Sequence, residues 1–307
     1  MISLKKVTYL IQAARPNQWI KNLVMYTSLV FSGNLLNQEL FIQVTIGVVL
    51  FSMLSSTSYI LNDIIDLPYD KKHPSKSLRP IATGKLSVQD ATTAVFLGAF
   101  IALLGSLLVS VPLFLISLAF LALHFLYSLV LKHRAVIDIF AISFSFMLRA
   151  FAGEVLSGYH IQIWLLLSIF FISLFLATVK RHAELVIQGT KTRQSLINYN
   201  EHFLYFLTTT FATMTITTYS LYTFLERPPA IKTLFSDRVV TFFPGFEALK
   251  WFMITIPVVV YGIARYAQLL YERDAGETPE KIITKDKPLI ISILLWGATV
   301  VSLIYIF

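Results

Sequence analysis

Long apolar stretches separated by short polar segments dominate the chain. A transmembrane helix needs roughly 20 apolar residues to cross about 30 Å of hydrocarbon. Windows of that length recur from one end of the sequence to the other. They predict about nine membrane-spanning helices, at residues 18–35, 39–61, 90–110, 112–131, 135–157, 162–180, 203–224, 249–271 and 288–307. The first of these is short and is interrupted by Lys21.

Composition agrees with this pattern. Hydrophobic residues make up 56% of the chain and charged residues 14%, and the mean hydropathy is +0.71, which is typical of polytopic membrane proteins. We expect an all-α bundle around a central cavity open to the cytoplasmic side. It would form a single domain, 1–307, with cytoplasmic cap loops at 62–89 and 180–202. The chain has no cysteine, which excludes disulfides and thiolate chemistry.

The distribution of basic residues predicts the topology. With nine spans, about 20 of the 25 Lys and Arg residues fall on the side of the N-terminus. Those expected on the other side are Arg227, Lys232, Arg238 and Lys250. The positive-inside rule then places the N-terminus in the cytoplasm and Phe307 across a cell (inner) membrane. This topology accounts for the net charge of +8 without a nucleic-acid partner.

An acidic stripe closes the second predicted span. Asn62, Asp63, Asp66 and Asp70 recur at spacings that return to one helix face if the helix persists to Asp70. Like-charged carboxylates so placed repel one another unless a cation sits among them. Hard oxygen ligands suit Mg²⁺. Pro68 should end or kink the helix nearby, which makes Asp63 and Asp66 the firmer ligands and Asp70 the third.

The alternative interpretation of this stripe is a solvated acidic helix end. Acidic groups at a helix C-terminus oppose the helix dipole, which disfavours that interpretation. Basic side chains follow directly, at Lys71, Lys72, His73, Lys76 and Arg79. Adjacent blocks of acid and base favour a polyphosphate bridged to metal.

The fifth predicted span carries buried charge. Asp138 and Arg149 share one helix face with Ser145. Arg149 would lie about 21 Å along the helix from its start, inside the hydrocarbon layer. A guanidinium there usually faces a polar cavity or a partner. The structural alternatives are a pair with Glu154 or an escape toward the far surface. Asp138 is expected to join the metal or ligand site.

Two further segments offer polar side chains. Before the first span, Arg15, Gln18, Lys21 and Asn22 surround Trp19; an ordinary interfacial anchor would explain them equally well. After the sixth span, Lys180 and Glu184 have the spacing of a helical ion pair, which would leave Arg181 to reach a phosphate.

The motifs resemble those of a known family. The acidic stripe, the nine spans and Asp138 together resemble the UbiA-type intramembrane prenyltransferase superfamily. Further motifs are similar to its decaprenyl-phosphate phosphoribosyltransferase branch, namely Arg15-Pro16-x-Gln18-Trp19-x-Lys21-Asn22, His73-Pro74-x-Lys76-x-x-Arg79-Pro80-Ile81-Ala82-x-Gly84, Leu131-Lys132-His133, Leu148-Arg149-Ala150-x-Ala152-Gly153 and Lys180-Arg181-x-Ala183-Glu184-Leu185.

The resemblance implies a reaction and a set of site residues. Such enzymes move 5-phosphoribosyl from phosphoribosyl pyrophosphate to a polyprenyl phosphate and release pyrophosphate. Mg²⁺ on Asp63, Asp66 and Asp70 would neutralise the leaving group, with Asp138 beside it. The residues then expected to bind substrate are Arg15, Gln18, Lys21, Asn22, Asn62, Lys76, Arg79, Lys132, Arg149, Lys180, Arg181 and Glu184.

Alternatives remain at this stage. The superfamily's second DxxxD motif is not intact, because Ile142 stands at the fourth position after Asp138, which favours the phosphoribosyl branch. The second hypothesis is a prenyltransferase that moves a prenyl group from prenyl diphosphate to an aromatic or other acceptor. A transporter also needs intramembrane charge, but the charges gather at one mouth without an inverted repeat. The sequence allows a homo-oligomer and assigns no role to the loop 225–248.

Overall fold

The part of the protein that the structure describes is mostly helical. The computed structural model describes residues 4–73, 75–188, 199–226, 251–272 and 285–306, and no strand occurs within them. The chain divides into two compact units. Unit 1 comprises Met1–Ser28 and Asn37–Tyr159, and unit 2 comprises Leu29–Leu36 and His160–Phe307. The all-α prediction is confirmed.

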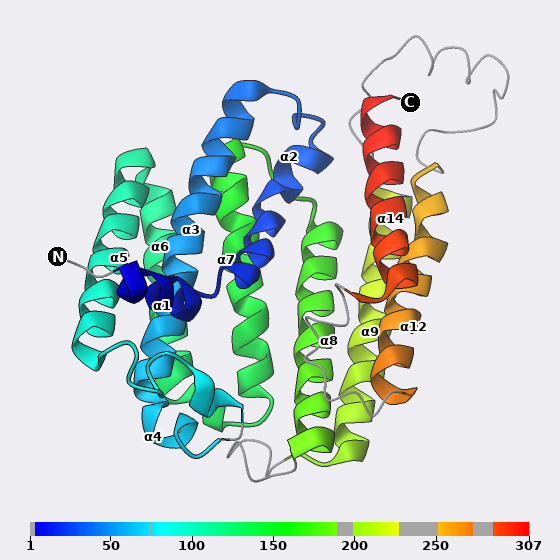
Figure 1. Cartoon of the computed structure of the whole chain (residues 1–307). Coiled ribbons are helices and arrows are strands. Elements are labelled where there is room, and N and C mark those ends of the chain that lie inside the picture. The colour runs from blue at the N-terminus through cyan, green and yellow to red at the C-terminus, as the bar shows by residue number, and fades with distance from the viewer. Residues whose placement is uncertain (1–3, 74, 189–198, 227–250, 273–284, 307) are drawn as a thin grey trace, which may run out of the picture. The chain divides into compact units, whose positions relative to one another are not determined.

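Unit 1 is built around one long helix, α3 (Gln38–Ile65). The chain order of its elements (Figure 1) is α1 (Leu4–Ala14), the 3₁₀ helix η1 (Pro16–Tyr26), α3, α4 (Leu67–Asp70), η2 (Lys76–Leu78), α5 (Val88–Val109), α6 (Val111–Leu129), η3 (Leu131–His133) and α7 (Ile137–Ser157). Helix α3 contacts α1, η1, α5, α6 and α7. Its side chains therefore meet most of the unit.

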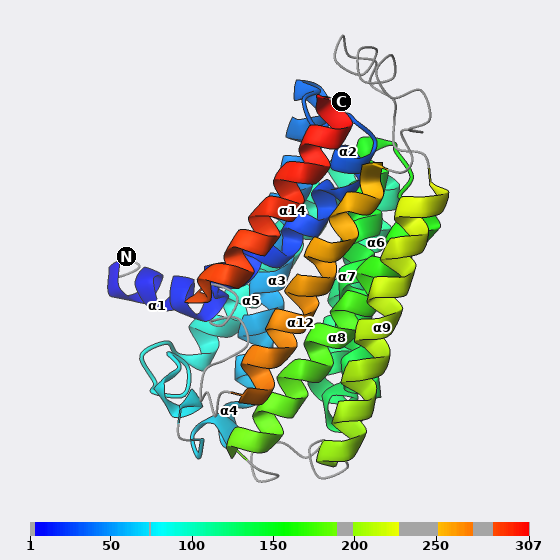
Figure 2. The same cartoon turned by 90° about the vertical axis from the view of Figure 1, so that its right-hand side faces the viewer.

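Unit 2 contains the later helices, which run alongside one another (Figure 2). They are α8 (Ile163–Gln188), α9 (Glu201–Leu225), η6 (Phe252–Thr255), α12 (Ile256–Glu272) and α14 (Lys287–Tyr305). The Tyr219 hydroxyl of α9 accepts a hydrogen bond from Trp296 Nε1 at 2.8 Å and pairs with the Thr255 hydroxyl at 2.7 Å. These bonds satisfy polar groups that lipid could not.

The number of spans differs from the prediction. Among the described residues, seven helices are long and apolar enough to cross a membrane. The predicted span 18–35 is instead the 3₁₀ helix η1 followed by the short α2 (Thr27–Phe31). The predicted span 203–224 forms helix α9, but its many threonines dilute its apolar character, and it is not among the seven. The expected count of nine is therefore not confirmed.

The predicted cap loops contain helical structure. Within 62–89 the chain forms α4 and η2 before α5 begins. Ser87 caps α5 as its spacing to Asp90 predicts, because its hydroxyl accepts from Asp90 N at 3.0 Å and donates to the Asp90 carboxylate at 2.7 Å. Within 180–202, helix α8 continues to Gln188. Residues 189–198 and most of the loop 225–248 lie outside the described residues.

Helix α7 and η1 approach so closely that only a glycine, Gly153, fits at their contact. A Cβ atom added to Gly153 would overlap the backbone carbonyl of Met25, and the Met25 side chain is itself fully buried. Interiors this dense have no room for an additional methyl group without backbone movement. The contact fixes the position of η1 against α7.

Replacement of this glycine tests the contact. We expect Gly153→Ala to lower the free energy of unfolding by about 2 kcal/mol, because the methyl group overpacks the interface. Gly297→Ala on α14 is the matched control, since no atom lies within 4 Å of the position that a Cβ would take there; it should be neutral or stabilising by up to about 1 kcal/mol. Denaturant unfolding in detergent micelles measures both. Equal effects at the two positions would contradict the packing argument.

Candidate active site

The acidic stripe lies where α3 passes into α4. Helix α3 ends at Ile65 and Pro68 lies in the first turn of α4, so the interruption that Pro68 predicts is confirmed. The hydrogen-bond pattern nevertheless continues, with Asp66 N donating to Asn62 O at 2.9 Å and Asp70 N to Asp66 O at 2.8 Å. All the acidic side chains therefore stay at one end of α3.

Asp63 and Asp70 converge on one cation. Arg79 Nη1 donates to Asp63 Oδ1 at 2.9 Å and to Asp70 Oδ2 at 2.6 Å. Both carboxylates are 2% exposed. Their oxygens can be no further apart than the sum of those distances, although seven residues separate them in sequence. Buried carboxylates so close together require positive charge between them.

Arg15 brings a second guanidinium to Asp63 from the N-terminal segment. Its Nη2 donates to Asp63 Oδ1, and its guanidinium carbon lies 5.1 Å from the centre of the Tyr59 ring. The Arg15 backbone is left-handed, with φ 51° and ψ 64°, at the junction where α1 ends and η1 begins with Pro16. This turn directs the Arg15 side chain toward α3. Arg15 therefore connects the end of α1 directly to the Asp63 carboxylate.

Asp66 belongs to a separate polar group. Lys132 Nζ pairs with Asp66 Oδ1 and donates to Asn62 Oδ1 at 3.2 Å. Asn62 Nδ2 in turn donates to Asp66 Oδ2 at 2.9 Å. Both Asp66 oxygens are therefore engaged in hydrogen bonds. The acidic stripe divides into two parts: Asp63 and Asp70 share Arg79, and Asp66 binds Lys132.

The turn between Lys132 and α7 is strained. Val136 has φ 69° and ψ −49°, and Ile137 N donates to Ala135 O at 2.8 Å. This is a γ-turn with positive φ, which is rare and costly for a β-branched residue. Strained backbone of this kind is held in place by its surroundings and is common at functional sites. Here it lies between Lys132 and the start of α7.

Asp138 follows this turn in the first turn of α7. It is fully buried, and its Oδ1 accepts a hydrogen bond from Ile139 N at 3.0 Å. An acidic side chain at a helix N-terminus is favoured by the helix dipole. Its assignment to the metal or ligand site stays a prediction.

Arg149 lies at the centre of a neutral polar network. Its Nε donates to Asn22 Oδ1 at 2.6 Å, and its Nη1 donates to Ser145 O at 2.9 Å and Ser145 Oγ at 3.0 Å. Its Nη2 lies 3.4 Å from Ser55 Oγ. The Phe120 ring centre is 4.6 Å from the guanidinium carbon. Within the described chain its hydrogen bonds go to neutral groups, so the alternative pair with Glu154 is not formed.

The other predicted residues of unit 1 lie on nearby elements. Gln18 and Lys21 are half-buried on η1, and Lys76 is half-buried at the start of η2. The buried His73 organises η2, because its Nδ1 accepts from Ser75 N and Lys76 N, both at 3.2 Å. The substrate roles of Gln18, Lys21 and Lys76 stay predictions.

Lys180, Arg181 and Glu184 belong to unit 2. In the structure the Glu184 carboxylate accepts from Arg181, and its pairing with Lys180 stays a prediction. Arg181 and Glu184 have an i,i+3 spacing, which also places side chains on one helix face. Arg181 is 2% exposed. Their assignment as phosphate ligands stays a prediction.

The residues present fit Mg²⁺ as a ligand shared with phosphate. The oxygens of Asp63 and Asp70 converge where the Arg79 cation now lies, and both are hard donors. In the described ranges, no three His, Cys, Asp or Glu side chains form a metal site by themselves. Magnesium commonly uses one or two carboxylates and completes its shell with water and substrate phosphates, which this pair allows. Asp66 as a third ligand stays a prediction.

Comparisons with known proteins agree with this architecture. The chain matches the UbiA prenyltransferase family over residues 23–285. It is 34% identical to the decaprenyl-phosphate phosphoribosyltransferase of Mycolicibacterium smegmatis, over 97% of this chain and 93% of that protein. The protein of that name from Mycobacterium tuberculosis H37Rv is also 34% identical, over 96% and 93%.

A solved structure shares the fold. The UbiA homolog from Archaeoglobus fulgidus bound to DMAPP and Mg²⁺ superposes with a TM-score of 0.71 at 16% identity, over 97% of this chain and 99% of that one. The fold and the family match define a multi-pass membrane protein with transferase activity. The chain belongs to the UbiA prenyltransferase family. The resemblance seen in the motifs is confirmed, and the transporter alternative is not retained.

Sequence reasoning missed the residues that fix this site from outside the motifs. Val136 carries no reactive group, and only its position between Lys132 and Asp138 hinted at a role. Ser55 and Phe120 face Arg149 from other helices, and no local spacing reveals such contacts. The contact between Ser145 and Arg149 is different, because their shared helical face did predict it.

A double-mutant cycle tests the lysine–aspartate pair. We expect Lys132→Met to lower the free energy of unfolding by about 3 kcal/mol, because it leaves the Asp66 carboxylate without its cation. Lys132→Met combined with Asp66→Asn should recover at least about 1 kcal/mol, since no unpaired charge remains. Denaturant unfolding in micelles gives both values. Strictly additive effects would show that the residues do not interact.

Val136→Gly tests the strain in the turn. Glycine adopts positive φ without steric cost, so we expect a gain of about 1 kcal/mol in the free energy of unfolding. Val136→Ala keeps a Cβ atom and should gain less. The same unfolding assay compares the variants, and a Val136→Gly protein no more stable than the Val136→Ala protein would contradict a strained native turn.

Proposed function

We propose that the protein transfers 5-phosphoribosyl from phosphoribosyl pyrophosphate to a polyprenyl phosphate of the decaprenyl type and releases pyrophosphate. The observation that carries this choice is 34% identity, over nearly the whole chain, to proteins named decaprenyl-phosphate phosphoribosyltransferase. The charge cluster of unit 1 supports it chemically. Arginine and lysine beside buried carboxylates suit a phosphorylated substrate bridged to a cation.

Asp63 and Asp70 would hold Mg²⁺ together with the diphosphate. When bound, the ion supplies Lewis-acid neutralisation of the charge that develops on the leaving pyrophosphate. The arginines in contact with these carboxylates, Arg15 and Arg79, would donate to phosphate oxygens. Bidentate donation by a guanidinium gives both attraction and orientation.

Lys132 would present a fixed ammonium group to the substrate. Asp66 and Asn62 hold it at the same end of α3, so the charge is oriented before substrate binds. Such preorganisation lowers the cost of ordering in the reaction. In this assignment Asp66 acts on Lys132 as well as on any metal.

The bond changes require little from a general base. An oxygen of the lipid phosphate forms a bond to the anomeric carbon, and the bond from that carbon to pyrophosphate breaks, with its electron pair leaving on pyrophosphate. The acceptor is already an anion, so no proton must be removed from it. The chain's contribution is therefore to bind and orient both phosphates and to neutralise charge.

The second candidate is prenyl transfer from a prenyl diphosphate to an aromatic or other acceptor. The Asp63, Asp70 and Arg79 cluster favours it equally well, because it would bind any diphosphate–metal complex. The missing second DxxxD after Asp138 weakens it. A direct comparison of donors separates the two functions.

We also infer that the protein lies in the cell (inner) membrane with its N-terminus in the cytoplasm. A water-soluble sugar phosphate would reach the carboxylates from that side. Lys71 and Lys72, exposed beside Asp70, support this orientation through the positive-inside rule. The prenyl chain of the acceptor would remain in the bilayer.

A donor comparison tests the function. We expect purified protein with Mg²⁺ to transfer label from phosphoribosyl pyrophosphate to polyprenyl phosphate, and not from prenyl diphosphate to an aromatic acid. Asp63→Asn and Asp70→Asn should each lower kcat by roughly 10²-fold or more, because charge stabilisation at the leaving group is lost. Label incorporation into extracted lipid gives the rates.

Glu39→Gln is the control for general loss of charge. Glu39 is exposed in the first turn of α3, about 36 Å along the helix from Asp63 at 1.5 Å per residue, and its substitution should leave kcat unchanged. Transfer only from prenyl diphosphate would replace the first function by the second. Full activity of Asp63→Asn would remove the assigned site.

A further inference from the structure

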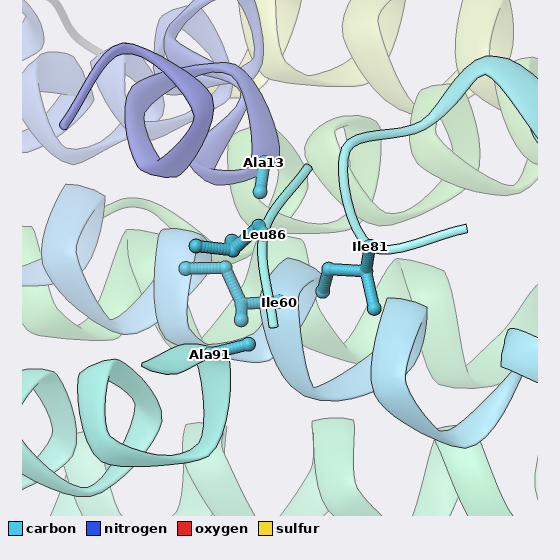
Figure 3. Close-up of a cluster of buried hydrophobic side chains, with 5 residues drawn as sticks. All are labelled: Ala13, Ile60, Ile81, Leu86 and Ala91. Atoms are coloured by element: carbon cyan, nitrogen blue, oxygen red, sulfur yellow. The ribbon is translucent and has the colours of Figure 1, made fainter. Parts of the chain in front are cut away.

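One face of helix α1 packs against the rest of unit 1. Its residue Ala13 packs into a buried apolar cluster together with side chains from α3, the cap loop and α5, and these point toward one another in Figure 3. Tyr9 and Leu10, on the same face as Ala13, pack against the cluster. The cluster comprises Ala13, Ile60, Ile81, Leu86 and Ala91.

Two polar contacts of α1 add to this packing. Lys6 Nζ pairs with Asp90 Oδ2 at 2.9 Å, and Lys85 Nζ lies 5.7 Å from the centre of the Tyr9 ring. Both partners belong to the end of the cap loop or to the first turn of α5. Helix α1 is therefore held in a defined rotation about its own axis.

The rest of α1 divides into an apolar and a polar face. Val7 is 42% exposed and Ile11 is 54% exposed, and their spacing of four places them on one stripe. Exposed polar residues, Lys5, Thr8 and Gln12, form the next stripe around the helix. A helix with one face on protein, one apolar and one basic and polar suits the boundary between acyl chains and headgroups.

The place of α1 in unit 1 agrees with such a boundary. It crosses the direction of α3 in both views (Figures 1 and 2). It meets α3 at Ile60, five residues before that helix ends, or about 8 Å from its end at 1.5 Å per residue. The chain beyond α1 continues with exposed apolar side chains, at Trp19, Ile20 and Leu23.

We propose that α1 lies in the plane of the bilayer surface on the side of Asp63. Val7 and Ile11 insert between acyl chains, and Lys5 contacts anionic lipid headgroups. Each lysine near an anionic surface contributes about 1 kcal/mol. Because α1 ends at Arg15, whose guanidinium contacts Asp63, the lipid surface also holds the residue that neutralises the acidic cluster.

Spin labels on single cysteines test this placement. The chain has no cysteine, so Val7→Cys, Ile11→Cys and the matched control Gln12→Cys each accept one nitroxide. In nanodiscs of phosphatidylcholine and phosphatidylglycerol, we expect the labels at positions 7 and 11 to be relaxed by oxygen, which concentrates in the acyl region. The label at position 12 should be relaxed by a water-soluble nickel chelate. The expected oxygen-to-nickel ratio is at least roughly tenfold higher at position 7 than at position 12.

Equal ratios at the three positions would overturn the proposal. Low access to both reagents at positions 7 and 11, with dipolar broadening between labels, would also overturn it and assign the apolar stripe to a second copy of the chain. The measurement uses no substrate, so it stands or fails independently of the proposed reaction.

A measurement on the unmodified protein covers the case in which labelling disturbs the fold. We expect amide hydrogen exchange in 4–14 to be roughly fivefold slower in nanodiscs containing phosphatidylglycerol than in nanodiscs of phosphatidylcholine alone. Fivefold is the change in an equilibrium constant that corresponds to the contribution of one lysine, about 1 kcal/mol. Exchange that is unchanged by the anionic lipid would remove the headgroup contact from the proposal.

Discussion

Buried charge must be compensated inside a membrane protein, and this requirement connects the sequence-distant parts of unit 1. Asp63, Asp66 and Asp70 lie at the end of one helix, yet the cations that neutralise them come from the N-terminal segment, the cap and the turn before α7. Desolvated carboxylates without partners would cost several kcal/mol each. The acidic stripe therefore determines where Arg15, Arg79 and Lys132 lie, and with them the elements that carry them.

Arg149 shows a different solution to the same problem. Its guanidinium is 2% exposed, and its partners are amide, hydroxyl and carbonyl dipoles together with the faces of Phe120 and Phe146. Aromatic faces and oriented dipoles stabilise a cation without a counter-charge. This arrangement also fixes the position of η1, because Asn22 is a residue of η1 and accepts a hydrogen bond from Arg149. The same unit thus contains an acid–base cluster at one end of α3 and, beside Ser55 of that helix, a cation of α7 that neutral dipoles stabilise.

The sequence predicted what depends on local periodicity and missed what depends on long-range contact. Apolar windows identified the long helices, and the spacing of Ser87 and Asp90 identified a helix start. The stretch 18–35 was mistaken for a span because composition does not distinguish an α-helix from a 3₁₀ segment. The division of the acidic stripe between Arg79 and Lys132 could not be predicted, since it depends on contacts between residues as far as 66 positions apart in the sequence.

The hydrogen-bond chain that begins at Arg149 runs in only one direction. Asn22 accepts from Arg149 through Oδ1 and donates through Nδ2 to Ser52 Oγ at 3.0 Å, and that hydroxyl donates to Val48 O at 2.7 Å. Each group in this chain accepts a hydrogen bond from the side of the guanidinium and donates one on the other side. The amide of Asn22 therefore has a single allowed orientation. The dipoles of this chain all turn their negative ends toward the guanidinium, so groups that reach as far as the backbone of α3 stabilise the charge of Arg149.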